Sequence, residues 1–153
     1  MATRTKMADI VSKEVRSRMM SGIRSRDTRP ELLVRKYLHA AGFRYSLRRR
    51  PDLPCQPDLV LPKYCAAIFV HGCFWHRHKG CKFATTPKTN TRDWERKFAR
   101  NLERDALCLS SLHETGWRTA VIWECNLKRQ SDHSLSLLID WLRSSDDRHF
   151  ILG

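Results

Sequence analysis

The sequence lacks any uninterrupted apolar run near the roughly 20 residues that a transmembrane helix needs. Its start, MATRTKMADIVSKEVRSRMM, also lacks the apolar centre of a secretory signal. The sequence contains no internal repeat, no low-complexity tract and no linker long enough to divide it into domains. We therefore expect a folded protein that resides in the cytoplasm and has no membrane partner.

Acidic residues are scarce, because 16 Asp and Glu stand against 29 Lys and Arg, which gives a formal net charge of +13. A charge this positive on 153 residues favours a polyanionic partner, since contacts with phosphates release condensed counterions. No long basic amphipathic helix stands apart from the fold, so nucleic acid is favoured over an acidic membrane surface. Hydrophobic residues make up 41% of the chain, which is enough for a full core.

The pattern of apolar and capping residues predicts an α/β fold, in which helices cover a central sheet. Residues 1–28 read as a basic arm with some helix, and residues 29–153 as a single domain. Thr28, Pro30 and Glu31 form a capping box at the start of the first long helix. The expected elements are a helix over 29–41, strands over 43–47, 59–61 and 66–70, a loop over 71–90, a helix over 91–115, a strand over 117–124 that leads into Cys125, and a last helix that follows residue 131 or 132.

Cysteine and histidine residues concentrate in the loop over 71–90. A tetrahedral Zn²⁺ needs four nitrogen or sulfur ligands, and a short Cys/His cluster with one distant cysteine can supply them. His78 is the expected histidine ligand, and His71 and His76 are alternatives for that role. For Cys55, Cys65 and Cys108 we expect packing as small side chains rather than disulfides or metal ligands. The predicted structural zinc ligands are Cys73, His78, Cys81 and Cys125.

One carboxylate stands where a nuclease would hold a divalent cation. Asp58 directly precedes an apolar strand, and the next strand delivers His71 and then His76. Such an acid can hold a cation against a phosphate and lower the pKa of bound water. Asp52 sits in the same Pro-Asp dipeptide, and only the apolar run after Asp58 favours the latter. His76 suits a general base or acid near neutral pH, although it could equally be a solvated loop residue.

Aromatic residues also occupy an unusual place in this polar loop. Phe74 and Trp75 are consecutive, and a small core cannot easily bury both. Exposed aromatic side chains beside Lys and Arg suggest stacking on bases or wedging between them. The alternative is that one packs inward and the other lines the zinc site, and core packing alone would explain Trp94.

These residues form a pattern that resembles the very short patch repair endonucleases. The resemblance runs in order over about residues 14–128, and its most specific parts are the HGCFWH block and the distant WEC. The matching segments are 57–60 (PDLV), 69–76 (FVHGCFWH), 101–105 (NLERD) and 117–125 (WRTAVIWEC), with Met20, Ile23, 26–28 (RDT) and Glu31 on the N-terminal side.

The resemblance implies a restriction-endonuclease-like fold with a mixed sheet, and a magnesium-dependent nick 5′ to the thymine of a T:G mismatch left by deamination of 5-methylcytosine. It implies that Asp58 and the carbonyl of Val70 bind Mg²⁺ and that His76 activates water. Asp105 would orient His76, while Glu31 and His71 would support the cleavage centre. Other residues would contact DNA: Phe74, Trp75 and Trp94 from the major groove, Met20 and Ile23 from the minor groove, and Asn101 from the long helix.

Two departures from the family pattern bear on the metal sites. Val70 stands where a threonine is expected, and the spacing from His78 to Cys81 is one residue longer, so the choice between His76 and His78 as zinc ligand stays open. We expect a monomer that acts on duplex DNA, with repair-protein partners unspecified. Two alternatives remain: a nuclease of the same fold with another lesion or sequence as target, and a zinc-stabilised DNA-binding module without catalysis.

Overall fold

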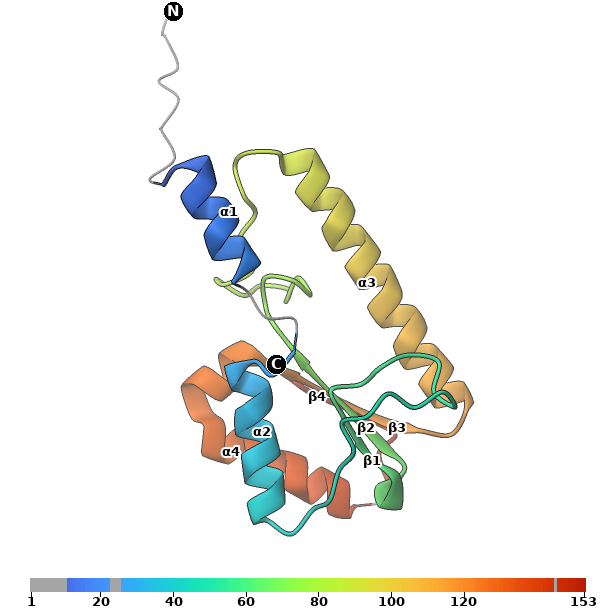
Figure 1. Cartoon of the computed structure of the whole chain (residues 1–153). Helices are drawn as coiled ribbons and strands as arrows, with labels where there is room; N and C mark the ends of the chain where they lie inside the picture. The colour runs from blue at the N-terminus through green and yellow to red at the C-terminus, as the bar shows by residue number, and fades with distance from the viewer. Residues whose placement is uncertain (1–10, 23–25, 145) are drawn as a thin grey trace, which may run out of the picture.

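A computed structural model describes residues 11–22, 26–144 and 146–153 of the chain. These residues form helices and the four strands of one sheet (Figure 1). The elements are α1 (Lys13–Ser21), α2 (Arg29–Ala40), β1 (Leu59–Leu61), the 3-10 turn η1 (Pro62–Tyr64), β2 (Ala66–His71), α3 (Thr91–Glu114), β3 (Arg118–Trp123), α4 (Glu124–Arg143) and β4 (His149–Leu152).

The sheet is mixed, with the strand order β1-β2-β3-β4. β1 pairs with β2 in antiparallel fashion, with Leu59 opposite Ile68. β3 lies parallel to β2, and β4 lies parallel to β3. Every residue of β2 is buried, as its apolar sequence predicts for an inner strand that helices cover on both faces.

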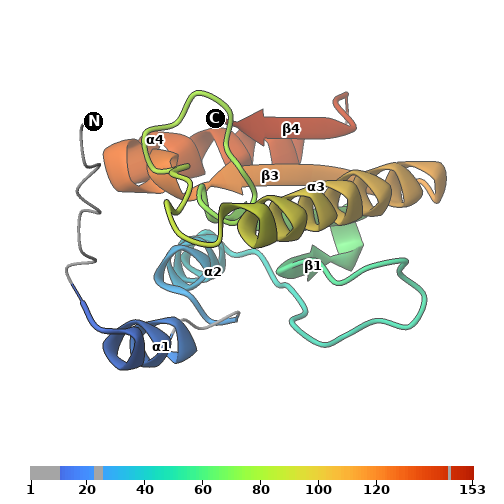
Figure 2. The same ribbon diagram turned by 90° about the horizontal axis from the view of Figure 1, so that it is seen from above.

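Two apolar clusters fill the space on the two faces of this sheet. On one face Ile68 and Ile122 pack with residues of α2 and α4, including Leu38 and Leu138. On the other face the alternate strand residues, including Phe69, pack against α3. α3 therefore covers one face, while α2 and α4 cover the other (Figure 2).

The predicted mixed α/β fold is confirmed, but four elements differ from the expectation. α4 begins at Glu124, whereas the last helix is expected only after residue 131 or 132. Residues 43–47 form a single bridge, Ser46 to Val60, instead of a strand, because the Arg and Pro residues that follow turn the chain away. The strand over 117–124 ends at Trp123, so Cys125 lies in the first turn of α4. β4 was not predicted, because its four residues are too short to show a period.

α1 belongs to the predicted basic arm and is confirmed as a helix. Ser12 caps it, and none of its residues is buried. The side chain of Arg16 donates a hydrogen bond to Thr89 Oγ1 at 3.3 Å, which joins the arm to the loop before α3. In the described part of the chain, no helix has the length and apolar character that crossing a bilayer requires.

Candidate active site and cysteine–histidine cluster

Asp58 lies at the entrance to β1, with its carboxylate turned toward β2. Its backbone N–H donates to the carbonyl of Ile68 at 3.0 Å, and its Oδ2 accepts a hydrogen bond from the Val70 N–H at 2.7 Å. Burial raises the pKa of the Asp58 carboxyl to about 6, the Val70 N–H opposes this rise, and the charge of Glu31 adds to it. The site thus holds a carboxylate whose negative charge is poorly compensated, which suits a divalent cation with oxygen ligands.

Three further side chains converge at the end of β2. The rings of His71 and His76 stack with centroids 3.9 Å apart and an interplanar angle of 3°. His76 Nδ1 lies 2.5 Å from Oδ2 of Asp105, which α3 contributes. Burial, followed by the charge of His76, lowers the pKa of His71 to about 4, so His71 is neutral at physiological pH. His76 can therefore exchange a proton through Nε2 while Asp105 orients its ring.

Glu31 is buried at the start of α2, and the predicted capping box is present in extended form. Thr28 Oγ1 accepts from the Glu31 N–H at 3.4 Å and donates to Glu31 Oε1 at 3.1 Å. Glu31 Oε2 accepts from the N–H of Asp27, one residue before the cap, at 2.9 Å. The carboxylate is close enough to Asp58 for its charge to act on that group. Capping and a place near Asp58 are thus combined in one residue.

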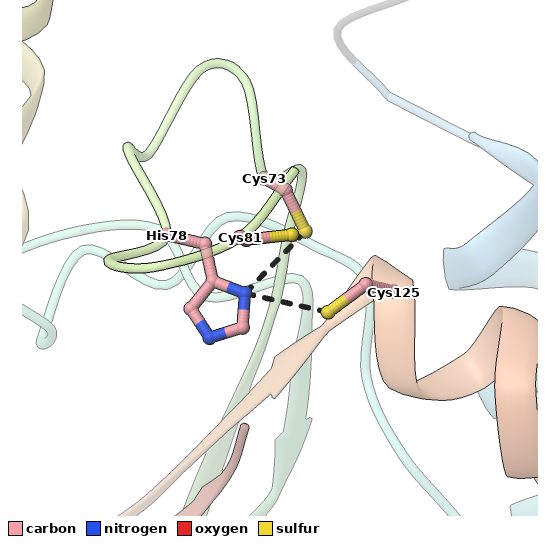
Figure 3. A group of neighbouring side chains, drawn as sticks. All are labelled: Cys73, His78, Cys81 and Cys125. Atoms are coloured by element: carbon pink, nitrogen blue, oxygen red, sulfur yellow. Dashed lines mark hydrogen bonds between the residues drawn. The ribbon is translucent and has the colours of Figure 1, made fainter. Parts of the chain in front are cut away.

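The four predicted zinc ligands meet between the loop after β2 and the first turn of α4 (Figure 3). One potential ligand atom from each residue lies within 4.8 Å of all the others in the set Cys73, His78, Cys81 and Cys125. His78 Nδ1 is 3.6 Å from Cys73 Sγ and 3.3 Å from Cys125 Sγ. The structure thus brings His78 into this cluster and leaves His76 with Asp105, although both histidines were candidates.

The donor set of this cysteine–histidine cluster fits a metal with a preference for sulfur. Three thiols and one imidazole match the tetrahedral ligand sets of structural Zn²⁺. Burial raises the pKa of the Cys73 thiol to about 12, so this thiol would stay protonated without a cation beside it. A divalent ion would displace that proton and close the loop around itself.

An aromatic cluster projects from the same loop onto the N-terminal half of α3. Phe74 contacts Trp75, Trp94 and Phe98 with ring centroids 5.2, 5.5 and 5.3 Å apart. Phe98 is buried, whereas the other three rings are only partly buried. Asn101, a predicted DNA contact, donates from Nδ2 to the Trp75 carbonyl at 3.3 Å and so supports the loop. The partly exposed rings can still stack on or between bases.

The two predicted minor-groove residues belong to the arm. Met20 lies on α1 and is partly buried, next to Met19, which is 62% exposed. Ile23 lies outside the described residues, so its predicted contact stays a prediction.

Two cysteines behave differently from the expectation. Cys55 and Cys108 form a disulfide across 53 residues, so the interpretation of both as unpaired packing residues is wrong. The pairing arises because α3 lies over the loop that precedes β1, a proximity that the spacing of the cysteines does not reveal. Cys65 is a free, exposed cysteine.

Comparisons with known proteins agree with this geometry. The family model described as DNA mismatch endonuclease Vsr matches residues 8–82. The chain is 45% identical over 121 residues to the Type II nicking enzyme V.XorIIP of Xanthomonas oryzae pv. oryzae, a match that covers 79% of this chain and 88% of the relative. It is 38% identical over 140 residues to DNA mismatch endonuclease Vsr of Escherichia coli, which covers 89% of this chain and 88% of the relative. The chain belongs to the very short patch repair endonuclease family.

As a member of the very short patch repair endonuclease family, the chain is a DNA endonuclease. The family model ends one residue after Cys81, so it includes Asp58, His76 and the first three cysteine–histidine ligands. Asp105 and Cys125 lie beyond that match, and the structure is what brings them to the two sites.

One residue of this family member escaped the sequence analysis. Arg35 lies one helical turn after Glu31, and its guanidinium binds both Glu31 and Asp27. The i,i+4 spacing of Glu31 and Arg35 indicates an ion pair on one face of a helix. Such pairs are usually exposed and contribute little to stability, so the spacing alone does not indicate a functional role. Here the Arg35 and Glu31 side chains are only 11% and 5% exposed.

Proposed function

We propose that this chain nicks duplex DNA on the 5′ side of the thymine in a T:G mismatch that arises from deamination of 5-methylcytosine. The observation that carries the proposal is that Asp58 lies close enough to His76 for their charges to interact, while His76 belongs to the His71, His76 and Asp105 group beside the partly exposed aromatic cluster. Two relatives support it, since one is named a mismatch endonuclease and the other a nicking enzyme. The mixed sheet with helices on both faces is compatible with a restriction-endonuclease-like fold.

In the proposed reaction, the residues around Asp58 perform phosphodiester hydrolysis. His76 accepts a proton at Nε2 from the water that attacks phosphorus, because its Nδ1 is engaged by Asp105. The P–O bond to the leaving sugar oxygen breaks, and that oxygen takes up a proton from solvent. Asp105 keeps the ring oriented and stabilises the imidazolium that forms. Neutral His71 covers one face of that ring and keeps solvent from it.

The donor atoms fit Mg²⁺, which would be held by Asp58 and by the main-chain carbonyl of Val70. When bound there, Mg²⁺ supplies a Lewis acid for the phosphate and lowers the pKa of coordinated water. Val70 can serve in this role despite its apolar side chain, because only its backbone oxygen is required.

The cysteine–histidine cluster has a structural role in this proposal. Zn²⁺ held by Cys73, His78, Cys81 and Cys125 would fix the loop that carries His76, which lies between the first two ligands in the chain. The loop is polar and contains glycine, so packing alone gives it little stability.

Mismatch recognition is assigned to the aromatic cluster and the arm. Phe74, Trp75 and Trp94 would enter the base stack from the major groove. A mismatched pair favours this entry, because it costs less to unstack than a matched pair. Met20 of α1 would enter from the opposite groove. The Nζ atom of Lys97 lies 4.9 Å from the centroid of the Trp94 ring. A positive charge beside the aromatic cluster would favour contact with DNA phosphates.

Incubation of an end-labelled T:G duplex with the protein and Mg²⁺ tests this function, with the flanking bases varied and a T:A duplex as reference. Asp58→Asn should reduce the nicking rate roughly a thousandfold, the loss of about 4 kcal/mol of transition-state stabilisation, while mismatch binding persists. Asp52→Asn is the matched control, because Asp52 shares the Pro-Asp context but is exposed and paired with Arg50. Equal nicking by the Asp58 variant would remove this carboxylate from the mechanism, and nicking that ignores the mismatch would favour another target.

A further inference from the structure

Arg35 is a charged residue that the mechanism above does not use, although it lies among the carboxylates of the cleavage centre. Its Nη1 contacts Asp27 Oδ1 at 2.6 Å, and its Nη2 contacts Glu31 Oε2 at 3.1 Å. Its Nε is buried and finds no hydrogen-bond partner in the part of the chain that the structure describes. A buried N–H group without a hydrogen-bond partner costs free energy. The hydrogen bonds of Arg35 alone therefore do not explain why this side chain is buried here.

The reason lies in the surroundings of Glu31. Its carboxylate is almost fully buried, and a buried carboxylate stays ionised only with charge or hydrogen-bond compensation. The Asp27 N–H and the Thr28 hydroxyl each donate one hydrogen bond to it, and Arg35 adds the full positive charge. Because guanidinium does not lose its proton in proteins, this compensation persists at every pH at which the protein is folded.

The same charge reaches Asp58. The Glu31 carboxylate is buried and the Asp58 carboxylate is partly buried, and the negative charge of Glu31 disfavours ionisation of Asp58. Arg35 and His76 are the two groups whose charges favour the ionised form of Asp58. Of these, only Arg35 carries a permanent charge. Without Arg35, the two carboxylates would still repel each other, and the permanent positive charge of the guanidinium would be lost.

Arg35 also connects this centre to the C-terminal end of the arm. Asp27, its second partner, has a positive φ of 55°, a conformation that costs energy for a residue other than glycine. The Arg35 guanidinium and the Glu31 carboxylate both bind Asp27, the former at its side chain and the latter at its N–H. The bidentate bridge therefore fixes the backbone just before α2 together with the orientation of Glu31.

We propose that Arg35 is a positioning residue of the endonuclease, which fixes the orientation of the Glu31 carboxylate beside Asp58 and supplies a permanent positive charge there. The inference rests on the proposed function for its kinetic part. It assigns Arg35 no contact with DNA and no proton transfer, because the described polar contacts of its guanidinium are to Asp27 and Glu31.

Three variants of the full-length, zinc-loaded protein test the role. Arg35→Gln removes the charge, Arg35→Lys keeps the charge but cannot bridge two carboxylates in a fork, and Lys36→Gln removes an exposed charge from the next position of the same helix. The measurements are the single-turnover nicking rate on a T:G duplex, the affinity for that duplex, and hydrogen exchange of the Asp27 amide without added magnesium.

We expect Arg35→Gln to lower the nicking rate about 10- to 100-fold, the range usually seen when a group that orients the surroundings of a metal site is lost. DNA affinity should stay within about twofold, and the Asp27 amide should exchange faster because Glu31 no longer holds it. Arg35→Lys should give an intermediate rate, and Lys36→Gln should leave the rate unchanged. In a Glu31→Gln background, Arg35→Gln should cause less than about a twofold further loss, because the two residues act as one unit.

Several results would overturn the inference. Wild-type rates in both Arg35 variants would do so, as would an equal loss in the Glu31→Gln background. If Arg35→Gln does not fold, the lysine variant decides alone: a wild-type rate with an unchanged Asp27 amide contradicts the role. If the unmodified protein does not nick the duplex, the proposed function fails, and Asp27 exchange still shows whether Arg35 orients Glu31.

Discussion

Removal of the Cys55–Cys108 disulfide should destabilise the protein strongly. The bond closes a loop of 53 residues, and the chain-entropy relation gives about 4 kcal/mol for a loop of that size at 25 °C. Domains of this kind have a total free energy of unfolding of roughly 5–15 kcal/mol, so the loss is a large fraction of it. The bond joins α3 to the segment before β1.

Urea unfolding of the double variant Cys55→Ser/Cys108→Ser measures this effect, with Cys65→Ser as the control for removal of an exposed thiol. With an m-value of about 2 kcal/mol/M, the midpoint should fall by about 2 M in the double variant and remain unchanged in the control. Alkylation of the unfolded, unreduced protein should modify four thiols and, after reduction, six. Equal midpoints together with six reactive thiols before reduction would refute the reasoning.

Three other predictions concern the sites. Asp58→Asn should raise the free energy of unfolding at pH 7.5 by up to about 3 kcal/mol, because the pKa of Asp58 is raised from 3.8 to about 6 in the folded protein. The stability of the unmodified protein therefore falls as the pH rises from about 4 to 6. Thermal melts below about pH 4 should show no difference between the variant and the unmodified protein. Purified protein should carry about one Zn²⁺ per chain by elemental analysis, Cys81→Ser should lose it, and Cys65→Ser should retain it; a zinc-free native protein would contradict this. Phe74→Ala/Trp75→Ala should reduce the preference for T:G over T:A in gel-shift titrations at least about tenfold, and an unaltered preference would exclude the wedge.

Local signals in the sequence were sufficient for the elements that begin with a cap or contain a clear apolar run. Thr28 and Glu31 predict the start of α2 at the observed residue, and the apolar runs of β1 and β2 predict the two strands that carry the site. The first half of α4 was missed because few of its residues are apolar, and Gln130 (φ −147°, ψ 61°) interrupts it before the predicted helix.

The candidate site shows the same division between local and long-range information. The Cys/His cluster could be predicted because three of its members lie within nine residues, which leaves one distant partner to find. The choice of His78 over His76, the Cys55–Cys108 pairing and the burial of the Arg35–Glu31 pair depend on how distant segments pack. Spacing along the chain does not contain that information.

The interleaving of two sites in one short loop has a consequence for how this protein can change over evolution. Cys73 and His78 belong to the cysteine–histidine cluster, while His76, which lies between them in the chain, contacts Asp105 of α3. An inserted or deleted residue between positions 73 and 78 would shift one set of side chains relative to the other. This stretch should therefore not tolerate a change of length, and a variant with one residue inserted between positions 73 and 78 should lose endonuclease activity.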